Sequence, residues 1–154
     1  MMLALIASLI LAQDPGPATS ERLPFDPTKL GDLAKVERKV NEDGRVVVYS
    51  GVPLATILEK QAKGVETMAG LRNLSDAVVL VRGSDGYQAA VSAVAVGMDP
   101  KGERYLLAVA RDGKPLGEGQ GPARLIVPDD PKHVRWVKNV VTIRLVRLDK
   151  LVGP

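Results

Sequence analysis

The segment 132–138, which reads KHVRWVK, carries the densest group of side chains able to bind an anion. Arg135 and Lys138 lie three residues apart in a turn that two nearby prolines stiffen, and Trp136 is expected to anchor that turn by packing. Arginine presents a planar fork of donors to phosphate oxygens, and lysine presents a compact positive charge. The segment could therefore form an anion site, but a solvated basic turn would have the same composition.

The composition excludes several other kinds of functional site. There is no cysteine and a single histidine, His133, which excludes disulfides, thiolate metal ligands, cysteine nucleophiles and multi-histidine metal clusters. His133 could act as a general base, but no partner serine is recognisable, and a histidine in a charged loop is more often a surface residue. The glycines of segment 117–121, GEGQG, precede Pro122 and a strand pattern instead of a helix, which excludes a Rossmann dinucleotide site.

The bulk composition indicates one globular domain. The chain has 154 residues, of which 45% are hydrophobic and only 3% are aromatic, so its core must be built mainly from Val, Leu, Ile and Ala. The net charge of +3 and the pI of about 9.3 are mildly basic. Few aromatic side chains could stack on bases, so a nucleic-acid partner is not expected.

The first 29 residues differ in composition from the rest. Residues 3–12 form an uncharged apolar run that is too short to cross a bilayer, which takes ~20 apolar residues. Residues 1–12 are interpreted as the signal peptide of a periplasmic or secreted bacterial protein, with no transmembrane span after its removal. A buried N-terminal helix or a short membrane anchor is the alternative. Residues 13–29 are rich in proline and are expected to be an extended linker, so the folded domain should cover residues 30–154.

The folded part should begin with a hairpin and a helix. Residues 35–40 alternate polar and apolar side chains, and the turn residues NEDG at 41–44 lead into a second strand over residues 45–49. Apolar residues recur at helical spacing over residues 51–64, which predicts a helix with Pro53 at its first position.

Short strands should dominate the remainder of the chain. Residues 65–74 are ambiguous and could form a second short helix. The Asp-Gly pair at 112–113 should close a strand with a tight turn. Strand patterns cover residues 77–83, 87–96 (running on into a loop or helical turn), 104–114, 123–128 and 139–148. Many short strands with one clear helix, and no regular strand–helix alternation, indicate the α+β class with a mixed or antiparallel sheet.

Four segments carry the most distinctive motifs of the chain. They are YSGVPLATILE (Tyr49–Glu59), VRGSDGYQAAVS (Val81–Ser92), LLAVARDGKPLGEGQGPARLIVP (Leu106–Pro128) and HVRWVKNVVTI (His133–Ile143). In this order and spacing they resemble the sulfite oxidase-type molybdopterin-binding oxidoreductase domain, over roughly residues 35–148. No single motif is decisive, but the series SGVPL, DGY, GPARLIVP and RWVK is fairly specific.

The resemblance implies an α+β domain with a mixed, strongly curved, barrel-like β-sheet and a few short helices. In family members that bind molybdopterin, the turn matching Arg135 to Lys138 helps to hold the phosphate of the cofactor. His133 begins the same matched segment, and Tyr87 should border the same pocket. The cofactor-binding residues expected from the resemblance are therefore Arg135, Lys138, His133 and Tyr87.

One departure from the family pattern bears on function. Catalytic members attach molybdenum through a cysteine thiolate on a segment just before the SGVPL match, and this chain has no cysteine. The leading hypothesis is an exported, stand-alone domain without molybdenum catalysis that could bind a pterin or another phosphorylated ligand. The alternatives are a divergent molybdopterin-dependent oxidoreductase and a periplasmic protein-interaction module on the same fold. The sequence identifies no catalytic residue, no metal site and no protein partner.

Overall fold

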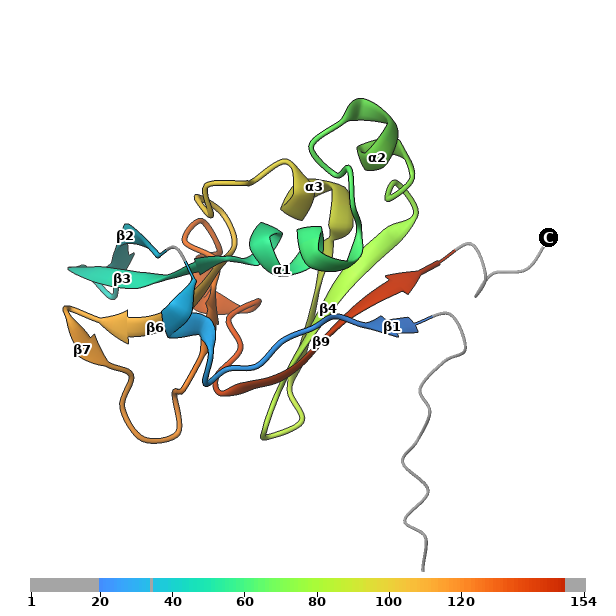
Figure 1. Cartoon of the computed structure of the whole chain (residues 1–154). Helices are drawn as coiled ribbons and strands as arrows, with labels where there is room; N and C mark the ends of the chain where they lie inside the picture. Colours follow the sequence, from blue (N-terminus) through green and yellow to red (C-terminus); the bar gives the residue numbers. More distant parts are fainter. Residues whose placement is uncertain (1–19, 34, 149–154) are drawn as a thin grey trace, which may run out of the picture.

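The structure of the protein is a computed structural model, which describes residues 20–33 and 35–148 (Figure 1). One sheet has the strand order β1 (Ser20–Arg22), β9 (Val140–Arg147), β4 (Ala77–Gly83) and β5 (Gln88–Ser92). The other has the order β2 (Val36–Glu42), β3 (Arg45–Pro53), β6 (Leu106–Arg111) and β7 (Lys114–Pro115), with β8 (Arg124–Ile126) also paired to β6.

The α+β class expected from the sequence is confirmed. All strand pairs within the two sheets are antiparallel. Over residues 20–33 and 35–148 the two sheets remain open and do not close into a barrel. The three α-helices of the described residues, α1 (Leu54–Gln61), α2 (Met68–Arg72) and α3 (Ala93–Gly97), are short and lie beside β4 (Figure 1).

Two tight hairpins in the second sheet have a direct consequence for the site described below. Asp43 and Gly44 take positive φ values of 50° and 83° between β2 and β3, and Asp112 and Gly113 take 50° and 76° between β6 and β7. Such turns need φ > 0 at both central positions, which Asp-Gly pairs tolerate. The predicted turns are therefore confirmed, and they fix the ends of β2 and β6, where Glu42 and Arg111 lie.

The predicted helix over residues 51–64 is too long at both ends. Residues 51–53 continue β3 and pair with β6 down to Pro53 opposite Leu106, so Pro53 is the N-cap and α1 starts at Leu54. The helix ends at Gln61, and its buried face includes Ile57 and Leu58. The start of α1 is set by the pairing of β3 with β6. The helical spacing of apolar residues carries no information on that pairing.

The described part of the predicted linker is packed on the domain. Ser20–Arg22 forms β1 and pairs with β9, and the next residue, Leu23, is 2% exposed and donates its N–H to the carbonyl oxygen of Ile143 at 2.9 Å. Residues 20–23 are therefore part of the fold, because the edge of β9 accepts Ser20–Arg22 as a further strand. The predicted signal peptide, residues 1–12, lies outside the described residues.

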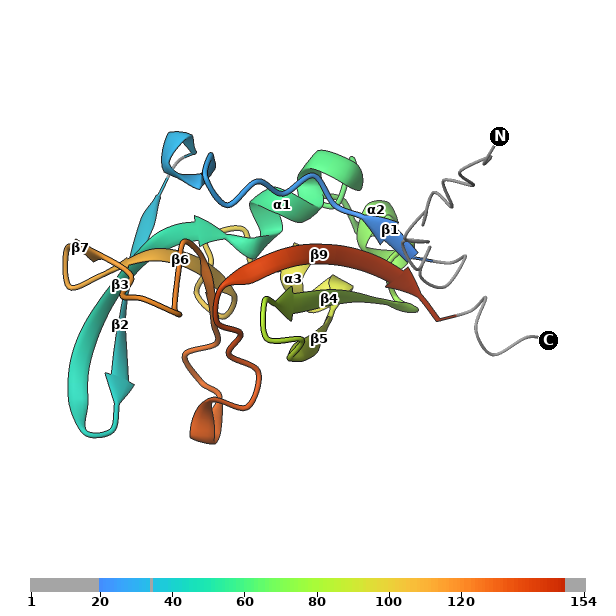
Figure 2. The same ribbon diagram turned by 90° about the horizontal axis from the view of Figure 1, so that it is seen from below.

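One hydrophobic core runs through both sheets and under the helices. It consists mostly of Val, Leu, Ile and Ala side chains, as the low aromatic content predicted, together with the buried rings of Tyr49 and Trp136. None of the described helices has the length and apolar character needed to cross a bilayer. Figure 2 shows that the loop carrying the 3-10 turn η2 (Pro131–His133) projects on the side of the sheets away from α1.

Candidate anion-binding site

A basic depression of about 440 Å³ lies on the second sheet. Three cations, Arg111, Arg124 and Lys138, line it together with the single carboxylate of Glu42. The remaining lining residues are Leu116, Gly117 and Gln120. The volume falls within the range of about 300–1,000 Å³ that is common for small-molecule sites.

Strand register places the side chains of this depression on one face. Arg111 of β6 lies directly opposite Tyr49 of β3. Glu42 lies opposite Arg45 at the end of the β2–β3 hairpin, and Arg45 is four residues before Tyr49 on β3. Side chains at directly opposed positions, and at even spacings along a strand, share a face. Glu42, Tyr49 and Arg111 therefore meet although they come from three strands.

A hydrogen-bond network joins these groups. The Oε2 atom of Glu42 accepts from the Tyr49 hydroxyl at 3.0 Å and from Nη2 of Arg111 at 3.1 Å. Nη1 of Arg124 lies 3.5 Å from the same Tyr49 oxygen. The buried phenol thus links the carboxylate to Arg124, and Arg111 binds the carboxylate directly.

The network fixes the charge of the depression. Burial acts to raise the pKa of Glu42, but hydrogen bonds from Arg111 and Tyr49 and the charges of Arg111 and Arg124 outweigh it, so this pKa lies below its ordinary value. Burial, partly offset by the charge of Arg124, raises the pKa of Tyr49. At neutral pH Glu42 is therefore an ionised carboxylate and Tyr49 a neutral phenol.

The ring of Trp136 packs against the Arg124 guanidinium. The Arg124 guanidinium lies 5.0 Å from the centre of the Trp136 ring, within the range of a cation–π contact. The indole is 5% exposed, donates Nε1–H to the Val127 carbonyl oxygen at 2.7 Å, and meets the Tyr49 ring edge-on at 5.9 Å between centroids. Trp136 is therefore the packing anchor that the sequence predicted.

Two polar atoms of the depression have no partner among the described residues. They are Nε of Arg124, a donor, and Oε1 of Gln120, an acceptor, and both are buried. A buried polar group without a hydrogen bond costs about 1–3 kcal/mol. Two side chains that line the depression therefore each hold an unsatisfied polar atom beneath its surface.

The structure separates the two predicted phosphate-binding residues. Lys138 is exposed and lines the depression. Arg135 is not one of the lining residues, and its guanidinium is bound to Asp130, which is buried. Burial acts to raise the pKa of Asp130, but the hydrogen bonds and the charge of Arg135 lower it below its ordinary value. The charge of Arg135 is thus balanced within the turn.

His133 and Tyr87 lie against the turn instead of lining the depression. The His133 ring stacks on Trp136, with 3.8 Å between centroids and 13° between planes. The Tyr87 hydroxyl donates to the carbonyl oxygen of Val134. Both residues hold the turn that carries Lys138, and neither is among the residues that line the depression.

Sequence reasoning missed the two arginines and the carboxylate of the depression. Arg124 lies within the matched segment GPARLIVP, and Arg111 directly precedes the Asp-Gly turn, so both positions carried a signal. Glu42 directly precedes the turn at Asp43 and Gly44, where a charged residue is unremarkable. Only the strand register shows that it faces the arginines.

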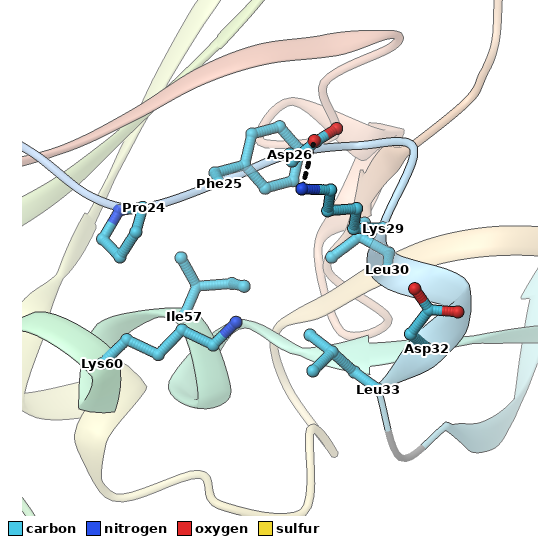
Figure 3. Close-up of a pocket in the computed structure, with 9 residues that line it drawn as sticks. All are labelled: Pro24, Phe25, Asp26, Lys29, Leu30, Asp32, Leu33, Ile57 and Lys60. Atoms are coloured by element: carbon cyan, nitrogen blue, oxygen red, sulfur yellow. Dashed lines mark ion pairs between the residues drawn. The ribbon is translucent and has the colours of Figure 1, made fainter.

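A second cavity, of about 420 Å³, lies between the segment 24–33 and α1 (Figure 3). Its apolar wall includes Leu30 and Ile57, and Lys29 forms an ion pair of 3.9 Å with Asp26 on its rim. Four charged side chains line this cavity, Asp26, Asp32, Lys29 and Lys60, and their charges balance. It is therefore a weaker candidate for an anion than the basic depression.

The donor set of the depression fits the phosphate part of a pterin cofactor better than its metal. Arginine and lysine donors suit phosphate oxygens. The protein ligand that the family resemblance implies for molybdenum is a cysteine thiolate, and the sequence contains no cysteine. The described residues also hold no group of three or more His, Cys, Asp or Glu side chains arranged to bind a metal ion.

Comparison with known proteins gives a match to a family. The sequence model of the family described as the oxidoreductase molybdopterin binding domain matches residues 34–150, which is more than half of the chain. Neither the curated proteins nor the solved structures include a significant match. The match covers every residue of the basic depression.

Proposed function

Because the chain belongs to the oxidoreductase molybdopterin binding domain family, we propose that it is an exported member that binds a phosphorylated ligand, such as a pterin phosphate, without molybdenum catalysis. The binding site is the depression lined by Arg111, Arg124 and Lys138. The observation that carries the proposal is this convergence of three cations on one partly buried surface beside a single carboxylate.

Electrostatics supports an anionic ligand at this site. Partial burial reduces solvent screening, so a phosphate between the cations interacts with them more strongly than it would at an open surface. Arg124 is held in place by Trp136 and Tyr49, so little side-chain entropy is lost when it binds an oxygen. Its Nε donor is buried and lacks a partner among the described residues, and it would gain one when the guanidinium turns toward the ligand.

Phosphate titration tests the binding site. Inorganic phosphate should bind the wild-type protein, and Arg124→Gln should weaken binding about tenfold or more, because each charged hydrogen bond contributes roughly 1.5–3 kcal/mol. Lys114→Gln is the matched control, since it removes an exposed positive charge from β7 outside the depression. Equal affinities of wild type and Arg124→Gln would overturn the proposed site.

Metal analysis tests the absence of molybdenum catalysis. Protein matured in a host that produces molybdenum cofactor should contain less than stoichiometric molybdenum, while native mass spectrometry should detect a retained phosphorylated ligand. Stoichiometric molybdenum together with oxidation or reduction of a sulfur substrate would overturn the non-catalytic part of the proposal and leave a divergent oxidoreductase.

Export rests on the apolar run of residues 3–12. When the full chain is produced in a bacterial host, the protein should be recovered outside the cytoplasm. Intact mass spectrometry should then show that the mature chain begins at Gln13. A full-length chain confined to the cytoplasm would contradict export and would leave the proposed ligand site unaffected.

A further inference from the structure

The depression contains acceptors as well as cations, and this combination restricts its ligand. Glu42 is a carboxylate that lines the same wall as Arg111 and Arg124. A site adapted only to a phosphate would gain nothing from a carboxylate there, because like charges repel at short range. The carboxylate therefore requires an explanation beyond phosphate binding.

Glu42 has one oxygen committed to the protein and one that faces no protein donor. Its Oε2 atom accepts from both Tyr49 and Arg111, at 3.0 and 3.1 Å. Among the described residues, Oε1 accepts no hydrogen bond from another side chain or from the backbone. The network thus fixes the orientation of the carboxylate and leaves its second oxygen able to accept a hydrogen bond from a ligand.

A second acceptor on the same wall gives an independent indication. Gln120 Oε1 is buried without a partner among the described residues, as is the donor Nε of Arg124. Both atoms are covered in the structure, so a ligand reaches them only when the two side chains turn toward it, and a ligand that satisfies both must itself carry an acceptor and a donor. A fully ionised phosphate supplies acceptor oxygens only, so with that form the donor must come from another part of the ligand.

The acceptors and cations lie close enough for one small molecule to reach both. The Tyr49 hydroxyl oxygen lies 3.0 Å from Glu42 Oε2 and 3.5 Å from Arg124 Nη1. The Glu42 carboxylate and the Arg124 guanidinium are therefore separated by this one oxygen atom. A water molecule has one heavy atom and occupies about 30 Å³ in the liquid, and a phosphate ion has five heavy atoms. The depression of about 440 Å³ is therefore much larger than a phosphate ion. Space remains beside the phosphate for the donor-bearing part of the ligand.

From this arrangement we infer that Glu42, assisted by Gln120, selects phosphate monoesters that also carry an ammonium or N–H donor near the phosphate. This inference rests on the proposed function, because it specifies the ligand class of the same depression. Arg111, Arg124 and Lys138 bind the phosphate oxygens, and Glu42 Oε1 accepts a hydrogen bond from the nitrogen. Selectivity then arises from one attractive contact and from repulsion of ligands that bring only negative charge to the carboxylate.

Two ligands of equal size test this selectivity in calorimetric titrations. O-phosphoethanolamine and n-propyl phosphate have the same number of heavy atoms, and only the first carries an ammonium group. The wild-type protein should bind O-phosphoethanolamine about tenfold more tightly, which is the effect of one charge-assisted hydrogen bond. Net charge alone predicts the reverse, because n-propyl phosphate is the more negative ligand.

Glu42→Gln should change the two affinities in opposite directions. O-phosphoethanolamine should bind more weakly, because the charged acceptor is lost, and n-propyl phosphate should bind more tightly, because the repulsion is removed. Glu118→Gln is the matched control. Glu118 is an exposed acid in the adjoining loop, and its own side chain does not line the depression. That control should keep the wild-type preference.

The outcomes separate the inference from the proposed function. If neither phosphate ester nor inorganic phosphate binds, both are overturned. If the esters bind but the wild type shows no preference, or Glu42→Gln keeps the preference, only the inference is overturned. Should Glu42→Gln fail to fold, Gln120→Met decides instead, because it removes the second acceptor at similar size. A reduced preference for O-phosphoethanolamine in Gln120→Met supports the inference, and an unchanged preference overturns it.

Discussion

Arg135 donates two hydrogen bonds from its guanidinium to Oδ1 of Asp130, at 3.0 Å from Nε and 2.9 Å from Nη2. Its backbone N–H also donates to Oδ2 of the same carboxylate at 2.5 Å. One acid thus closes the turn around the cation that follows it by five residues. The turn has its own counter-ion, and the cations that line the depression are Arg111, Arg124 and Lys138.

This pairing predicts that Arg135 contributes more to stability than to ligand binding. Arg135→Gln should lower the free energy of unfolding by roughly 1–3 kcal/mol, because the buried Asp130 carboxylate loses its charged partner. Phosphate affinity should change less than about threefold, since Arg135 does not line the depression. Urea unfolding and phosphate titration of the same variant measure both effects. A tenfold loss of phosphate affinity with an unchanged free energy of unfolding would contradict this prediction and would show that Arg135 binds the ligand.

The Asp130–Arg135 pair also predicts a pH dependence of stability. The pKa of Asp130 lies below its ordinary value, because the hydrogen bonds and charge of Arg135 outweigh the opposing effect of burial. Such a carboxyl stabilises the fold at pH values above its unfolded pKa of about 3.9, and this contribution is lost as the pH falls through the folded pKa. The stability difference between wild type and Asp130→Asn should be constant from about pH 5 to 8 and shrink below about pH 4. A difference that grows on acidification would contradict this.

Lys138 should contribute less to phosphate binding than Arg124. Lys138 is exposed, so its charge is screened by solvent and salt, whereas Arg124 is half-buried against Trp136. Lys138→Ala should weaken phosphate binding about two- to fivefold at low salt, and the effect should diminish at high salt. Lys114→Ala provides the exposed-lysine control. A salt-independent loss of tenfold or more would show that Lys138 makes a direct, desolvated contact.

Trp136 should be a major source of stability. Replacing a buried tryptophan by alanine costs about 3–5 kcal/mol, and here the change would also remove the surface that supports Arg124 and Tyr49. Trp136→Phe should be milder, because it keeps an aromatic ring and loses mainly the hydrogen bond to Val127. Chemical unfolding of both variants checks the order. Equal stability of Trp136→Ala and wild type would contradict its role as the anchor of the turn.

Gly51 should tolerate no side chain. It lies at the irregularity between β3 and β6, where an added Cβ would be 2.0 Å from the Leu107 carbonyl oxygen and 2.6 Å from the Ala108 Cα. Both are backbone atoms that cannot move without breaking the sheet, so Gly51→Ala should abolish folding or lower the melting temperature strongly. Gly31→Ala is the control, since nothing lies within 4 Å of its added Cβ. Melting curves distinguish the two.

The sequence by itself determined the local elements of this protein. Alternating side chains and Asp-Gly turns specify the β2–β3 and β6–β7 hairpins, because both signals act between residues that are close in the chain. The order of the matched motifs also determined the family. The start of α1 was missed, because Pro53 is held in β3 by pairing with Leu106, far along the chain.

Only the tertiary structure decided which charges meet. Glu42 and Arg111 are 69 residues apart, and Tyr49 and Arg124 are 75 apart, yet strand register brings all four together. The same packing pairs the Arg135 guanidinium with the Asp130 carboxylate, and it places Lys138 on the lining of the depression. Whether an arginine is neutralised by the protein or presented to a ligand depends on its neighbours across strands and turns. A basic segment in the sequence carries no information on those neighbours, because its composition is the same in either case.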